Sequence, residues 1–256
     1  MSNAPEEIRN NLFAFYDQVA QCKDIYAESH DCWSVIRNNP GTWPGIIYHV
    51  SADLFQNERS HELFEKVRSG IYPEVLIATD ENIRQMDPFL RSQGFYPFMA
   101  WKGMAREYTD QMQAPLLPQN VQVVTLDKPE DREQWVKIVS NELINPTLFD
   151  QALTESLRAR PGIELYLLKH EGEGVSTLMA YDSGDSTGLY MIATSNSARR
   201  KGFGHMLVQQ IVWQMNRQSK NPIILHATQK GEGLYAKSGF VPYNQFFLYR
   251  FLNPQP

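Results

Sequence analysis

The residues with the clearest chemical potential form a basic, glycine-containing segment between a predicted strand and a predicted helix. Arg199, Arg200 and Lys201 come directly before Gly202, and Gly204 follows two positions later. The first turn of a helix leaves N–H groups unpaired and carries a partial positive charge, and glycine lets an anion approach the main chain closely. The segment therefore predicts a binding site for a phosphate or pyrophosphate, with a solvated basic helix cap as the plainer alternative.

The glycine spacing excludes two common nucleotide-binding loops. No Gly-Lys-Ser or Gly-Lys-Thr follows, so the segment is not a P-loop. It also lacks the third glycine of a dinucleotide-binding fingerprint, and no early βαβ unit precedes it. A second notable segment, Leu234-Tyr235-Ala236-Lys237-Ser238-Gly239-Phe240, places a phenol in a short helix that a glycine terminates.

The hydrophobic pattern around these segments predicts an α+β protein, in which a mixed α/β sheet carries helices on both faces. In the second half we expect the order β-α-α-β-β-β-α-β-α-β, with elements at 121–126, 129–143, 147–159, 164–169, 175–181, 188–194, 203–219, 223–228, 231–238 and 245–251. In the first half we expect a helix over the first 30 residues, strands at 46–50, 75–78 and 98–105, and helices at 58–69 and 81–93.

A polar stretch with two prolines, residues 107–119, predicts a boundary between two domains, 1–115 and 120–256. A faint internal echo connects the two. Val75–Thr79 resembles Ile224–Thr228, and a Gly-Phe pair ends the following helix in each half, before an aromatic-rich strand. Gly is a common helix terminator, but three features in the same order favour a duplication.

Two motifs together resemble the GCN5-related N-acetyltransferase (GNAT) family. The family pattern [RQ]-x-x-G-x-[GA] after the fourth strand is present as Arg199-x-x-Gly202-x-Gly204. The family pattern L-Y-x-K-x-G-F after the fifth strand is present as Leu234–Phe240, and one helix and one strand separate the two motifs, as in the family. The resemblance implies a GNAT fold for residues 120–256.

The first half resembles the family only weakly. Its strand at 46–50 is followed by Ser51–Arg59, which contains no glycine and offers no phosphate loop of the same kind. The resemblance therefore implies a tandem protein with a degenerate, GNAT-like N-terminal half, which we expect to shape the acceptor site.

The resemblance implies an acetyl-CoA-dependent N-acetyltransferase, in which the acceptor amine attacks the thioester directly and forms a tetrahedral intermediate. Pantetheine would lie along the fourth strand, and the main-chain N–H groups from Arg200 to His205 would hold the pyrophosphate. Tyr235 matches the family's general acid, which supports the departing thiolate. The implied cofactor-binding residues are Ile192, Ala193, Thr194, Arg199, Arg200, Lys201, Gly202, Phe203, Gly204 and His205.

The general base stays open. Some family members place a glutamate on the fifth strand, where this chain has Ile223–Thr228 with His226 as its ionisable residue. Further candidates for the base are Glu142, Glu164 and Asp182. The alternative for each is that it is an ordinary structural or surface carboxylate. The same holds for the tryptophans that could line an acceptor cavity, namely Trp33, Trp43 and Trp101.

Composition limits the partners. The net charge is −5, which argues against binding to nucleic-acid phosphates. The two cysteines, Cys22 and Cys32, suggest neither a metal site nor a disulfide framework, so we expect no metal. No signal peptide and no bilayer-spanning run is evident, and we expect a cytoplasmic protein without a membrane partner.

Three functions remain for this sequence. The first is acetylation of a primary amine on a small molecule or amino acid, which the acidic charge balance and the extra domain favour. The second is acetylation of a protein N-terminus or lysine. The third is a non-catalytic, regulatory acyl-CoA-binding module, which the retention of Tyr235 beside the intact loop disfavours. The sequence names neither the acceptor nor the oligomeric state, although family members often form homodimers.

Overall fold

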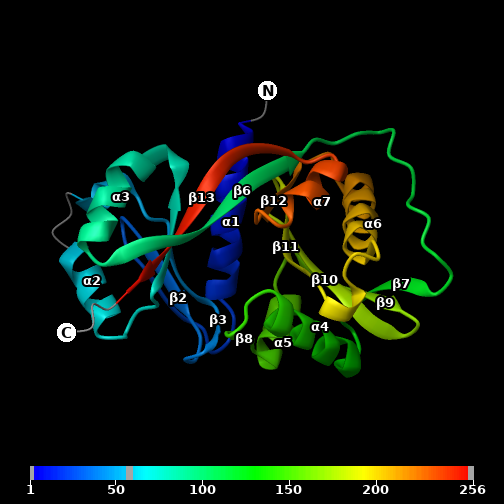
Figure 1. Ribbon diagram of the computed structural model, residues 1–256, viewed down its shortest axis with the longest axis horizontal. Coiled ribbons are helices and arrows are strands. Elements are labelled where there is room, and N and C mark those ends of the chain that lie inside the picture. Colours follow the sequence, from blue (N-terminus) through cyan, green and yellow to red (C-terminus); the bar gives the residue numbers. More distant parts are fainter. Residues whose placement is uncertain (1–2, 56–59, 253–256) are drawn as a thin grey trace.

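The computed structural model describes residues 3–55 and 60–252 (Figure 1). Their strands form one mixed sheet of eleven strands in the order β1-β2-β4-β5-β13-β6-β12-β11-β10-β9-β7. Two further short strands, β3 (Thr42–Trp43) and β8 (Leu148–Phe149), pair with each other in parallel and connect the halves at one side. None of the described helices combines the length and apolar character needed to cross a bilayer.

The second half contains every predicted element in the predicted order, with one addition. The short strand β8 lies at the start of the range predicted as a helix, 147–159, and that helix begins at Gln151. The amphipathic helices of this half cover both faces of the sheet, with α4 and α5 on one face and α6 on the other. The bounds are β7 (Val121–Thr125), α4 (Pro129–Glu142), α5 (Gln151–Arg158), β9 (Ile163–His170), β10 (Glu173–Asp182), β11 (Thr187–Thr194), α6 (Phe203–Gln218), β12 (Ile223–Ala227), α7 (Glu232–Lys237) and β13 (Val241–Phe251).

The first half differs from the expectation near its start, because the helix predicted for the first 30 residues ends at Ala20. Strands β1 (Tyr26–Ser29) and β2 (Ser34–Arg37) follow it. β1 has no apolar alternation, and tertiary contacts hold it instead, since Glu28 accepts hydrogen bonds from Lys66 and Tyr72. The other bounds are α1 (Ala4–Ala20), β4 (Gly45–Tyr48), α2 (Ser60–Arg68), β5 (Val75–Thr79), α3 (Ile83–Ser92) and β6 (Phe95–Arg106).

The two halves exchange their last strands. β6 of the first half pairs with β12 of the second, and β13 of the second half pairs with β5 of the first. β6 and β13 also pair with each other along most of their length, and they cross the middle of the molecule side by side (Figure 1). The single sheet therefore depends on main-chain hydrogen bonds between residues more than 110 positions apart in the chain.

The internal echo in the sequence corresponds to equivalent places in the fold. β5 and β12, α3 and α7, and β6 and β13 follow one another in the same order in the two halves. In each half the strand before the crossover helix has a tyrosine followed by a residue of positive φ: His49 (φ 55°) follows Tyr48 at the end of β4, and Met191 (φ 49°) follows Tyr190 within β11. The halves thus share a local backbone feature as well as an element order.

Helix α1 stands between the two lobes and packs against both (Figure 1). Its Asn11 is almost fully buried, and its amide donates hydrogen bonds to the carbonyl oxygen of Ser186 (2.9 Å) and to the hydroxyl of Ser183 (3.1 Å). The Tyr190 hydroxyl donates to Asn11 Oδ1 at 2.6 Å, and the ring of Phe15 stacks on Tyr190 with centroids 4.2 Å apart. These contacts connect the first helix of the chain to β11.

Replacing Asn11 with leucine should destabilise the protein by about 3 kcal/mol, because the buried hydroxyl of Tyr190 and the carbonyl of Ser186 would lose their partner. Urea unfolding followed by circular dichroism measures this change. The neighbouring exposed Asn10 offers the control, and Asn10→Leu should change the free energy of unfolding by less than about 0.5 kcal/mol. Equal effects from the two variants would contradict the anchoring role of Asn11.

Candidate active site

The parallel strands β11 and β12 separate soon after they begin. They pair only through Thr187–Leu189 with Ile223–Leu225. Beyond Leu189 the register of β11 against β10 shifts, and Met191 adopts a positive φ of 49°. Such a bulge bends a strand away from its neighbour. The predicted positions Ile192, Ala193 and Thr194 lie in this separated part, which pairs with β10 on one side and not with β12 on the other.

The glycine-containing loop enters α6 with the geometry that an anion site requires. Gly202 is left-handed (φ 86°), and so is Arg200 (φ 64°). The first N–H to bond back within the helix is that of Met206, which donates to the Gly202 oxygen at 2.9 Å. The N–H groups of Phe203 and Gly204 precede that bond and remain available to a ligand.

Gly204 lies close against the end of β11. A Cβ at this position would come within 2.9 Å of Thr194 Oγ1 and 3.4 Å of Leu234 Cδ1. The sequence therefore needs glycine here for close packing of helix on strand, and α7 lies within reach of the first turn of α6. The structure thus brings the loop, the end of β11 and the segment with Tyr235 together.

Glu142, at the end of α4, organises the loop. One carboxylate oxygen accepts a hydrogen bond from the Arg199 guanidinium at 2.6 Å, and the other accepts one from the Asn196 N–H at 2.8 Å. Arg199 also donates to the Thr194 carbonyl at 3.3 Å. Arg199 therefore connects the loop to α4 and β11, so its cation is already paired with a carboxylate.

The remaining predicted loop residues divide into exposed cations and packed side chains. Arg200 and Lys201 are exposed, and within the described part of the chain neither forms an ion pair. Phe203 is buried and its ring contacts His170 with centroids 4.9 Å apart. His205 is joined to Ser238 by a hydrogen bond of 3.1 Å between Nδ1 and Oγ, which connects α6 with α7.

Tyr235 lies in α7 and is nearly buried, with its ring against Phe240 (centroids 6.3 Å apart). Burial raises the pKa of the Tyr235 hydroxyl above its ordinary value of about 10. The hydroxyl therefore stays protonated at physiological pH and can donate a hydrogen bond. The first half has Leu90 at the matching position, four residues before Gly94, as Tyr235 lies four residues before Gly239.

The candidate bases lie in very different places. Asp182 lies at the far end of the β10–β11 hairpin, opposite Thr187, whereas the loop lies at the other end, where Ser176 pairs with Thr194. Glu164 accepts a hydrogen bond from Tyr166 on β9, two strands away from β11. Glu142 is held by Arg199, and only His226 lies on β12 directly beside the point of separation.

The three tryptophans lie in different parts of the fold. Trp33 is in the core of the first half, and Trp43 packs against Phe149 with centroids 5.1 Å apart. Trp101, which is partly exposed, contacts the His226 ring with centroids 6.1 Å apart. The sequence offered no means of choosing among them, because the contact between β6 and β12 arises only from the strand exchange.

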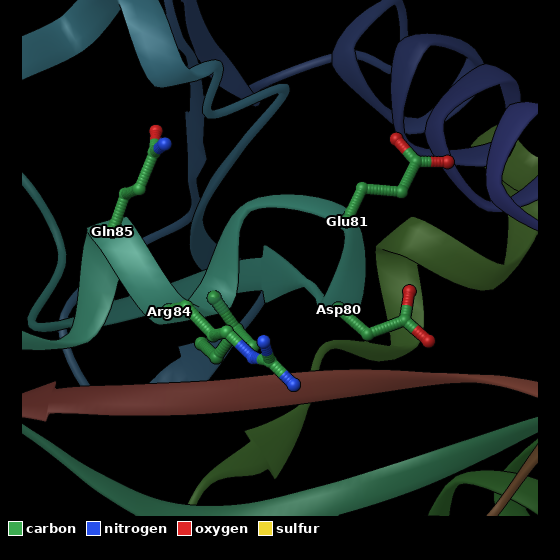
Figure 2. A pocket seen from close by; sticks show the side chains of 5 residues that line it. Asp80, Glu81, Arg84 and Gln85 are labelled. Atoms are coloured by element: carbon green, nitrogen blue, oxygen red, sulfur yellow. The ribbon is translucent and has the colours of Figure 1, made fainter.

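A pocket of about 440 Å³ lies elsewhere, where β5 leads into α3 in the first half (Figure 2). Figure 2 shows Glu81 pointing toward α1, where its carboxylate pairs with Arg9 at 2.6 Å. Asp80 accepts a hydrogen bond from the Gln245 N–H at 2.9 Å. Both acidic groups therefore already serve as contacts between elements of the fold.

The comparisons with known proteins agree with this geometry. A family model described as an acetyltransferase (GNAT) domain matches residues 127–248. The chain is similar to a solved GCN5-related N-acetyltransferase from Kribbella flavida (15% identity, TM-score 0.68, covering 100% of this chain and 97% of that chain). It is also similar to a conserved protein of unknown function from Staphylococcus epidermidis (14%, TM-score 0.61, 93% and 98%). A third similar structure is a tandem GNAT protein from the clavulanic acid biosynthesis pathway (11%, TM-score 0.60, 91% and 86%). No curated protein sequence matches the chain.

The class of protein is thereby defined as a mixed α/β protein with the GNAT fold. Residues 127–248 belong to the GNAT acetyltransferase family, and the chain as a whole is similar in fold to GNAT structures, a tandem GNAT protein among them. At these levels of identity the solved structures show the fold and leave the acceptor open.

Replacing Glu142 with glutamine should weaken coenzyme A binding about tenfold, because the loop would lose its ion pair with Arg199, and a tenfold change corresponds to about 1.4 kcal/mol. Isothermal titration calorimetry measures the dissociation constant. Glu133→Gln, an exposed position on the same helix, is the matched control and should leave the constant unchanged. An unchanged constant in the Glu142 variant would show that the loop does not need this carboxylate.

Proposed function

We propose that the protein transfers the acetyl group of acetyl-CoA to a primary amine of a small molecule or amino acid. The observation that carries this proposal is the meeting of three features at one end of the sheet. These are the unpaired N–H groups at the start of α6, the open main chain of β11 and the buried phenol of Tyr235. In the proposed reaction the amine nitrogen bonds to the thioester carbon, the carbon–sulfur bond breaks, and one proton passes from nitrogen to sulfur.

The loop would hold the diphosphate of the coenzyme. The N–H groups of Phe203, Gly204 and His205 point out of the first turn of α6, where the helix dipole favours an anion. Arg200 and Lys201 add positive charge without competing carboxylates among the described residues. The open edge of β11 at Ile192–Thr194 would pair with the amide-containing arm of the coenzyme, as an added strand pairs with a sheet edge.

Tyr235 would support the leaving sulfur. Because burial raises its pKa, full proton transfer to a thiolate of pKa about 8.5 is uphill, so a hydrogen bond to the developing charge is the larger contribution. A main-chain N–H of β11 near the bulge would stabilise the carbonyl oxygen in the same manner as an oxyanion hole.

Gly202→Val and Gly204→Val should each weaken coenzyme A binding by about 100-fold or more while the protein remains folded. Valine is strained at the φ of 86° that Gly202 adopts, and at position 204 its Cβ would collide with Thr194 Oγ1. Calorimetry gives the affinity and circular dichroism the fold. Gly233→Val is the control, since a Cβ there meets nothing within 4 Å. If the wild-type protein binds neither coenzyme A nor acetyl-CoA, the proposed function is wrong.

Tyr235→Phe should lower kcat for acetyl transfer about 100-fold and leave the dissociation constant of coenzyme A unchanged, because the phenol acts on the departing sulfur. Thiol release in the presence of a panel of primary amines measures kcat. Tyr243→Phe, at an exposed tyrosine, is the control and should behave as the wild type. Coenzyme binding without acetylation of any amine by the wild type would favour a non-catalytic acyl-CoA-binding module.

A further inference from the structure

His226 carries the one imidazole on β12, and its two ring nitrogens are buried without a hydrogen-bond partner among the described residues. Three aromatic side chains surround the ring. Tyr190 stacks on it with centroids 6.0 Å apart, Phe246 meets it edge-on at 4.7 Å, and Trp101 lies at 6.1 Å. Buried polar groups are nearly always paired, so two unpaired nitrogens on one ring require a reason.

The ring lies where an acetyl acceptor would have to arrive. Leu225 pairs with Leu189 at the last paired position of β11 and β12, and His226 is the next residue. Its ring contacts Tyr190 and Phe246, which face the layer of α1, α4 and α5. The glycine loop and α6 lie on the opposite face. The imidazole is therefore on the face of the sheet opposite the proposed coenzyme loop, the face that α1, α4 and α5 cover.

An apolar strip of β6 leads from the surface to this ring. Only residues 102–106 of β6 pair with β12, so the earlier part of the strand extends past the end of β12. Residues 96–100 are all exposed, including Met99, which is 42% exposed. Met99 and Trp101 face the same side, opposite Leu248 and Phe246 of β13, and the Trp101 N–H donates to the Met99 sulfur at 3.2 Å.

Resting on the proposed function, we infer that the acceptor is a weakly basic primary amine on a flat apolar body. The body lies on Met99 and Trp101, and the amine displaces the edge of Trp101 and donates a hydrogen bond to a ring nitrogen of His226. Two independent observations point to this arrangement: an unpaired imidazole at the end of β12, and an exposed apolar strip that leads to it.

The preference for a weak base follows from the neutrality of the pocket. Burial lowers the pKa of His226 to about 3, and no charged group among the described residues contributes to that shift. The ring is therefore a neutral acceptor at pH 7 and offers an ammonium group no counter-charge. A lysine-like amine of pKa about 10.4 is neutral in about one molecule in 2,500 at pH 7, whereas an α-amino group of pKa about 8 is neutral in about one in ten.

The first experiment compares His226→Phe with His226→Gln and the wild type. Phenylalanine keeps an aromatic ring at this position and removes the two unpaired nitrogens. Because replacing buried, unsatisfied polar groups with apolar ones does not destabilise a fold, the thermal midpoint of unfolding should stay equal or rise. The acceptor kcat/KM should fall at least about tenfold, the coenzyme A dissociation constant should not change, and glutamine should retain part of the activity. A structural histidine would give the reverse pattern, with a lower midpoint and unchanged kcat/KM, and that result overturns the inference.

The second experiment uses two acceptors with the same aromatic body, phenylalanine amide and 2-phenylethylamine. At pH 7 the wild type should prefer the amide by about 100-fold in kcat/KM, and the preference should narrow toward pH 9 as the alkylamine loses its proton. Met99→Ala should raise the acceptor KM severalfold. Phe98→Ala is the matched control, because Phe98 is equally exposed (42%) and Arg250 covers its ring at 4.5 Å.

The outcomes separate this inference from the function on which it rests. Two results would overturn the acceptor assignment and leave the proposed acetyltransferase function intact. In the first, the wild type binds acetyl-CoA and acetylates 2-phenylethylamine with the same kcat/KM as phenylalanine amide. In the second, the Met99 variant has the same acceptor KM as the Phe98 control. A wild type that does not bind the coenzyme overturns both. A strong preference for the amide, lost in His226→Phe at unchanged coenzyme affinity, supports the inference.

Discussion

The separation of β11 from β12 is the constraint on which the rest of the site depends. Parallel strands normally remain paired along their length, but here pairing stops after Leu189 and the main chain turns away at Met191. The open edge of β11 and the position of His226 at the end of the paired segment both follow from that divergence. The bulge is held from behind, because Tyr190, the residue before it, is anchored to Asn11 and stacked on Phe15 of α1.

The strand exchange brings a strand of the half without a glycine loop next to the candidate site. β6 belongs to the first half but lies beside β12, where it brings Trp101 against His226. The first half has Leu90 in place of the phenol and no glycine in the segment after β4. What it shares with the second half is the order of its elements, and what it places beside β12 is the strand β6. In the proposed function, the first half would contribute one wall of the acceptor site through β6.

Stability and chemistry are in tension around β12. The His226 nitrogens are buried and unpaired, which is costly in a folded core, whereas nearby polar groups such as Asn11 and Glu142 are fully engaged. The cationic side chains of the loop divide in the same way into paired and unpaired groups. Arg199 forms an ion pair with Glu142 that holds the loop, whereas Arg200 and Lys201 are exposed. Groups that hold the site in shape are paired, and groups proposed to meet a substrate are not.

The sequence alone determined the longer elements of the second half and the position of the loop. Periodicity placed the strands and helices, and Gly202 and Gly204 lie where a left-handed turn and a close helix–strand contact exclude a side chain. It missed β1 and β2, because a polar strand such as Tyr26–Ser29 has no hydrophobic period and is stabilised by distant partners, among them Lys66. The sequence also could not select the candidate base among His226, Glu142, Glu164 and Asp182, or the tryptophan nearest to the candidate site. Those positions depend on which strands become neighbours, and pairing between residues more than 110 positions apart leaves no local pattern in the chain.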